Sequence, residues 1–150
     1  LTMSVANGQA GNDPFANFPD LTAGLMDTEG CLGVEVAQTG SGKNVIFAWF
    51  KDKESCLNWY YHPMHRGAMK TFFPDSEDAG QPLEDVPHDV GPIMAIASIT
   101  FDQKANFEQT DLPISQIAIE LYTPLKGGIS LGGTFAPAAM DVPGVVRLDD

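Results

Sequence analysis

The chain has 150 residues, of which 8 are Lys or Arg and 20 are Asp or Glu, so its formal net charge at pH 7 is −12. This balance argues against nucleic acid or an anionic membrane as a partner, since both attract basic surfaces. The length suits one domain, residues 1–150, with a core of ordinary size, and no apolar run is long enough to span a membrane.

The first 30 residues predict a strand and an interrupted helix. Residues 1–7 alternate weakly and form the expected first strand, which would carry Asn7. Asp13 followed by Pro14 is typical of a helix start. Pro19 interrupts this helix, and we expect it to restart near Asp20 and to close before residue 31.

Residues 31–50 predict a β-hairpin. Positions 31–38 alternate with a period of two, and a Gly-rich turn at 39–43 leads into a second strand at 45–50. That second strand is apolar at every position, with Val45, Phe47 and Trp49 on one face. A strand that is apolar on both faces needs cover on both. We expect the second cover to come from later strands of this chain or from another copy of it.

A helix broken in the middle follows the hairpin. Asp52 is a good N-cap for a first segment at 53–61, in which apolar and aromatic side chains recur at helical spacing. Pro63 cannot lie inside a regular helix but suits the first position of a new one. The sequence therefore predicts a break at His62-Pro63 and a second segment from 63 to about 72.

The run GCLGVEV, the Gly-rich turn, NVIFAWF and DKESCLNWYYHPMHRGAM together resemble the antibiotic-biosynthesis-monooxygenase-like family. The resemblance covers about a third of the chain closely and residues 12–102 more loosely. It implies an α+β, ferredoxin-like subunit with an antiparallel sheet that forms a dimeric α/β barrel, and hence a homodimer. It also implies a Trp, here Trp49, that lines the cavity between sheet and helices. Haem-degrading members carry a His where this chain has Met69, so no cofactor is expected.

The remaining third of the chain extends the minimal family pattern. Residues 74–90 are acidic and Pro-rich and predict an exposed loop, and 92–101 form the next strand. Residues 114–122 and 128–135 predict an extra C-terminal β-hairpin around the turn at 123–127. We thus expect a core over about 1–102, a hairpin extension over about 113–136 and an irregular tail at 137–150.

The most distinctive polar cluster is His62-Pro63-Met64-His65-Arg66. The two histidines could face one metal ion, but no third ligand is evident, so no metal is expected. A pocket for a small acidic or phenolic ligand and simple helix capping remain equal alternatives for this cluster. Residues expected in catalysis are His62, His65 and Asn7. Those expected to bind a ligand are Trp49, Arg66, Trp59 and Tyr60.

Two functions from different classes follow. The first is a cofactor-independent, monooxygenase-like enzyme acting on a small aromatic or quinol-like substrate; the second is a non-catalytic ligand-binding or dimerisation module of the same fold. Cys31 and Cys56 are expected to be small buried residues rather than a disulfide. A cytoplasmic location is favoured over export, which stays open because the chain begins at Leu1 and not at Met.

Overall fold

The computed structural model describes residues 21–75, 81–140 and 142–149. The expected first strand at 1–7, with Asn7, lies outside these ranges. The helices are α2 (Leu21–Met26), α3 (Lys53–Tyr60) and α4 (Pro63–Phe72). The strands are β1 (Cys31–Gln38), β2 (Asn44–Phe50), β3 (Ile93–Phe101), β4 (Ile114–Tyr122), β5 (Ile129–Ser130) and β6 (Val146–Arg147). The predicted α+β class is confirmed, as are the hairpin β1–β2 and the break between the two central helices.

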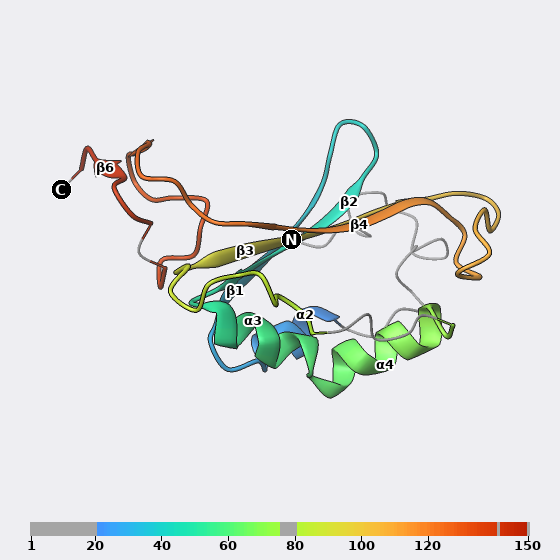
Figure 1. Ribbon diagram of the computed structural model, residues 1–150. Coiled ribbons are helices and arrows are strands. Elements are labelled where there is room, and N and C mark those ends of the chain that lie inside the picture. Colours follow the sequence, from blue (N-terminus) through green and yellow to red (C-terminus); the bar gives the residue numbers. More distant parts are fainter. Residues whose placement is uncertain (1–20, 76–80, 141, 150) are drawn as a thin grey trace.

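The sheet is a four-stranded antiparallel meander in the order β1-β2-β3-β4, and the helices lie against one of its faces (Figure 1). The ladder between β2 and β3 runs without interruption from Asn44 opposite Ile99 to Phe50 opposite Ile93. The chain reaches β3 from β2 through α3, α4 and residues 73–92. Strands that are neighbours in sequence are therefore also neighbours in the described sheet.

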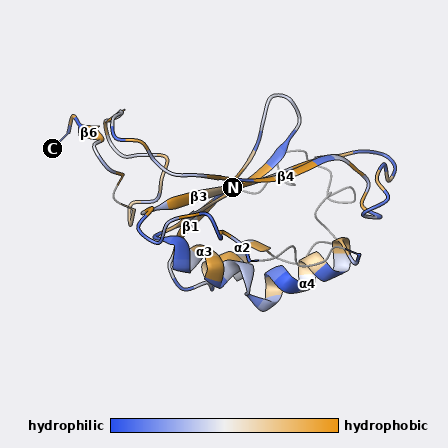
Figure 2. Cartoon of the chain, in the orientation of Figure 1, coloured by the Kyte–Doolittle hydropathy of each residue, from blue (hydrophilic) through white to orange (hydrophobic). Residues whose placement is uncertain are grey.

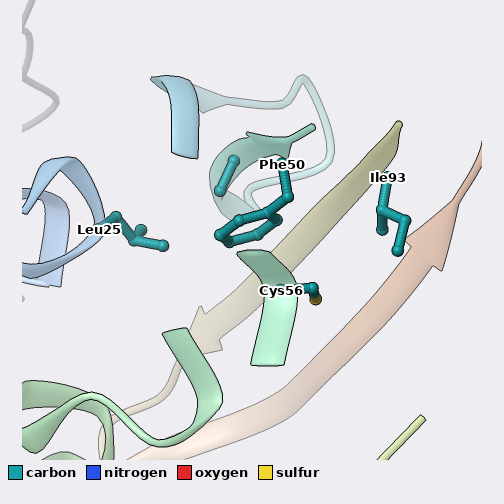
Figure 3. Close-up of a cluster of buried hydrophobic side chains, with 5 residues drawn as sticks. Leu25, Phe50, Cys56 and Ile93 are labelled. Carbon is teal, nitrogen blue, oxygen red and sulfur yellow. The ribbon is translucent and has the colours of Figure 1, made fainter. Parts of the chain in front are cut away.

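The main core lies between this sheet and the helices. It is formed by Leu25 of α2, Cys56 of α3, Ile93 of β3, and Ala48 and Phe50 of β2 (Figure 3). Phe50 is completely buried, and a side chain of its kind stabilises a fold by about 1.5–3 kcal/mol when fully buried. Because successive side chains of a strand point to opposite faces, Ala48 and Phe50 place Trp49 on the face away from the helices.

The second face of β2 is covered by the same chain. The Phe135 ring packs edge-on against Phe47 and Trp49, with ring centroids 5.0 and 5.2 Å apart. Trp49 is only 2% exposed. On β1, a Cβ atom at Gly33 would come within 2.8 Å of the Pro137 ring, so the missing side chain makes room for this segment. Of the two covers expected from the sequence, the later part of this chain is the one observed at Trp49.

The extra C-terminal hairpin is a wrong prediction. Strand β4 pairs antiparallel with β3, from Met94 opposite Tyr122 to Phe101 opposite Ile114. The region expected as its hairpin partner contains only β5, which pairs in parallel with β6. The apolar positions of β4 continue the face formed by β3 and so find partners there. Gly127 and Gly128 have positive φ angles that turn the chain away from β4.

The described part of the acidic loop, residues 81–90, is anchored to the core. Its Leu83 and Val90 pack against the main cluster of buried side chains. Lys53, buried at the start of α3, donates a hydrogen bond of 2.7 Å from Nζ to the Val86 carbonyl oxygen. The acidic side chains Glu84, Asp85 and Asp89 are exposed, as expected.

Candidate functional site: the junction of helices α3 and α4

The junction between α3 and α4 is built around His62 and Pro63. Pro63 has no N–H to donate to the preceding turn, so α3 ends at Tyr60 and α4 begins anew. His62 adopts an extended conformation, and its Nδ1 accepts a hydrogen bond of 3.1 Å from the Met64 backbone N–H. His62 is thus the N-cap of α4, which is the capping alternative expected from the sequence. An N-cap contributes about 1 kcal/mol.

The other ring nitrogen of His62 is also occupied. Since Nδ1 accepts a hydrogen bond, Nε2 carries the proton and donates to Asp27 Oδ2 at 2.9 Å. Asp27 follows α2, so this contact joins the end of α2 to the start of α4. With both nitrogens engaged, His62 has no free lone pair to offer a ligand.

In His65, one turn further along α4, the proton is on the other ring nitrogen. Its Nδ1 lies 2.9 Å from the Tyr60 carbonyl oxygen. A carbonyl can only accept, so Nδ1 carries the proton and Nε2 keeps its lone pair. No hydrogen bond to Nε2 is made by any residue that the structure describes. Burial lowers the pKa of His65 below its usual value of 6.5, against the smaller opposing effect of the Tyr60 carbonyl. The imidazole is therefore held neutral, with its lone pair at Nε2.

Aromatic side chains surround this imidazole. The ring centroids of Trp59 and Tyr60 lie 5.2 and 5.3 Å from that of His65, and Trp59 also lies 5.6 Å from His62. Helix α2 packs closely here, because a Cβ atom at Gly24 would lie 2.9 Å from Met64 Cβ and 3.1 Å from the Trp59 ring. The structure thus brings four of the expected residues, Trp59, Tyr60, His62 and His65, to one place.

A shallow depression of about 460 Å³ opens beside His62. It is lined by Asp27, Thr28, Glu29, Glu54, Leu57, Asn58, Tyr61, His62 and Pro63. Sequence reasoning missed its three carboxylates, which come from the turn after α2 and the first turn of α3. The only signal was the run DTEG that closes the first helical region, and nothing in it indicates that it meets residue 62. His65 does not line this depression.

The other expected site residues lie elsewhere. Trp49 lies on the opposite side of the sheet, so the expectation that it lines a cavity between sheet and helices is not met. Arg66 is exposed on α4 and forms no ion pair with a described residue. Asn7 lies outside the described residues.

The described ranges hold no cluster of three or more His, Cys, Asp or Glu side chains placed as metal ligands. His88 approaches Glu54, with 3.4 Å between Nδ1 and Oε1, on the surface. Cys31 and Cys56 are both free thiols. Burial raises the pKa of Cys56 to about 11 and also raises that of Cys31, so both are protonated, weakly nucleophilic side chains.

Comparison with known proteins gives no family: no family model, no curated protein and no solved structure matches the chain. Over residues 21–75, 81–140 and 142–149, no helix is both long and apolar enough to cross a bilayer.

Proposed function

We propose that the α3–α4 junction binds a small hydroxylated aromatic molecule, a phenol or a quinol, and that His65 accepts the proton of its hydroxyl group. The observation that carries this proposal is the fixed tautomer of His65, in which Nδ1–H donates to the Tyr60 carbonyl and Nε2 keeps a lone pair that no described residue engages. The lowered pKa of His65 keeps this lone pair available at neutral pH.

The rings beside His65 suit such a ligand. Trp59 and Tyr60 flank the imidazole and offer aromatic faces and edges to a planar molecule. Removing the hydroxyl proton produces a phenolate, which gives up an electron more readily than the neutral phenol. That is the first step that a cofactor-independent, monooxygenase-like oxidation with dioxygen as the oxidant requires. Trp49 has no part in this proposal, and Asn7 remains an expected orienting group.

The test is the binding of phenol and hydroquinone, followed by tryptophan fluorescence over a range of pH. Binding should weaken as the pH falls through the lowered pKa of His65 and the imidazole becomes protonated. His65→Gln should lose this pH dependence, whereas the exposed His88→Gln should keep it. The same pH profile in both variants would exclude His65 as the proton acceptor. An oxygen electrode separates the two classes of function, because ligand binding without oxygen uptake indicates a non-catalytic module.

The second candidate is a dimerisation module, favoured by apolar side chains that remain exposed in the C-terminal third of the chain. On strand β4, Ile117, Ile119 and Leu121 are 40, 65 and 41% exposed. Exposed apolar surface of this extent is typical of a protein–protein contact. A homodimer is the form that the family resemblance implies, and native mass spectrometry of the purified chain tests it.

The ferredoxin-like dimeric barrel is a narrower form of the same proposal. Its support is the α+β class, with helices on one face of an antiparallel sheet. Its first strand would come from residues 1–7. Within the described sheet, β2 already pairs directly with β3. Because Phe135 covers Trp49, a second copy is not needed to bury this part of the second face of β2.

A further inference from the structure

Among the residues that the structure describes, strand β4 is an edge of the sheet, with β3 as its only neighbour. In an antiparallel ladder, successive residues direct their N–H and C=O groups alternately toward one neighbour and away from it. The Thr39 N–H donates to the Lys43 carbonyl oxygen, which shows which residues of β1 and β2 direct their backbone groups toward each other. The registers between the strands then extend this alternation through β3 to β4. It leaves the backbone groups of Ile117, Ile119 and Leu121 facing outward.

The side chains of the same three residues form an apolar row on one face of β4. They lie opposite Ile99, Ala97 and Ala95 of β3 and so continue the face that carries the core. Ile117, Ile119 and Leu121 are nevertheless 40, 65 and 41% exposed. Figure 2 shows the hydrophobic colouring of β4, and Figure 1 shows the helices on one side of the sheet. Outward backbone groups and exposed apolar side chains thus coincide on one strand.

We propose that β4 pairs antiparallel with β4 of a second copy of this chain, about a two-fold axis at Ile119, and so joins two four-stranded sheets into one. This inference rests on the proposed homodimer and names its surface. In this register Ile119 meets Ile119 of the second copy, and Ile117 meets its Leu121. Main-chain hydrogen bonds would supply affinity, and the apolar row would fix the register.

The pattern of β4 favours a second copy over an unrelated strand. Its apolar row, Ile-x-Ile-x-Leu, is nearly symmetrical about Ile119, which makes the strand complementary to itself. A C₂ interface needs this property. Natural edge strands are usually protected by Lys or Pro within the strand, and the sequence ISQIAIELY of β4 contains neither.

Charge also favours this surface. The chain carries a formal charge of −12, so two copies repel each other over most of their surface. Strand β4 carries a single charged residue, Glu120. In the proposed register Glu120 lies opposite Ala118 of the second copy, so no like charges stand directly opposite one another.

The test is the oligomeric state by analytical ultracentrifugation and native mass spectrometry. The unaltered chain should be dimeric. Ile119→Lys should raise the dimer dissociation constant by about a hundredfold or more, since it removes two apolar side chains from the interface and places two ammonium groups opposite each other. The matched control is Leu131→Lys, the same change at an exposed apolar residue outside β4, and it should remain dimeric. Circular dichroism confirms that both variants are folded.

A cross-linking variant tests the register directly. Paired residues at the axis have Cα atoms about 5.5 Å apart, a separation that a disulfide spans. Ile119→Cys should therefore form a covalent dimer on mild oxidation, and the more exposed Leu131→Cys should not. A monomer at every concentration would overturn both the homodimer and this interface. A dimer that survives Ile119→Lys, or that cross-links through Leu131→Cys instead, would overturn this interface alone.

Discussion

Gly30 joins the end of α2 to β1 at a point where no side chain fits. Its φ angle is +88°, and a Cβ atom added there would lie 1.8 Å from Ser55 Oγ and 2.4 Å from Ser55 Cβ. Rotating the Ser55 hydroxyl cannot relieve a contact with Cβ. Ser55 is 1% exposed, and its hydroxyl donates to Asp52 Oδ1 at 2.7 Å. Gly30→Ala therefore forces the start of α3 to move.

The expected loss of stability has two parts. A left-handed conformation costs about 1–2 kcal/mol in a residue that carries a Cβ atom, and overpacking a tight site costs about 1–3 kcal/mol. Gly30→Ala should thus lower the free energy of unfolding by about 2–5 kcal/mol. A protein of this size has only about 5–15 kcal/mol in total. Urea unfolding followed by circular dichroism measures this loss.

Gly42→Ala is the matched control. Its φ angle is +89°, but a Cβ atom there meets nothing within 4 Å, so only the backbone cost of about 1–2 kcal/mol remains. Both substitutions restrict the unfolded chain equally, and the difference between them isolates the contact with Ser55. If Gly30→Ala loses no more stability than Gly42→Ala, the close approach to Ser55 does not constrain the fold and the reasoning is refuted.

Three further changes test the second sheet face, the buried imidazole and the helix cap. Phe135→Ala should uncover Trp49, with a red shift of its fluorescence and a loss of about 0.5–1.5 kcal/mol; unchanged emission would mean that another group covers Trp49. His65 has a lowered pKa in the folded state, so the unfolded chain binds more protons and stability falls as pH drops below 6.5. His65→Gln should flatten this part of the pH–stability curve, and an unchanged slope would contradict the burial argument. Asp52→Ala should cost about 1 kcal/mol in urea unfolding through loss of the α3 N-cap, and a neutral result would exclude capping by this residue.

Local patterns in the sequence were sufficient to predict most of the described helices and strands. The alternation at 31–38, the Gly-rich turn, Asp52 as a cap and Pro63 at a helix start each act within a few residues of chain. These preferences hold wherever the segment lies in space, and the structure follows them closely. The break at His62-Pro63 is the clearest case, since the missing N–H of Pro63 decides it without any tertiary contact.

The candidate site could not be predicted from local patterns, because it depends on a contact between residues that are distant in sequence. His62 and His65 are three residues apart on one helix, but the first is held by Asp27 across 35 positions and the second by the carbonyl of Tyr60 next to it. Their spacing in the sequence does not distinguish the two histidines. Only the packing of α2 against α4 shows that both nitrogens of His62 are occupied, and only the path of the chain from α3 to α4 shows that Nε2 of His65 keeps its lone pair.

The sequence by itself determined the α+β class, the hairpin and the broken helix, and it required a cover on both faces of β2. The tertiary structure alone decided which cover that is and where β4 lies. Strand pairing is set by which apolar faces meet, and the period of two in β4 fits β3 as well as it fits residues 128–135. The contact of Phe135 with Trp49 and the pairing of β4 with β3 join residues that are far apart in the chain, and no local preference encodes such a choice.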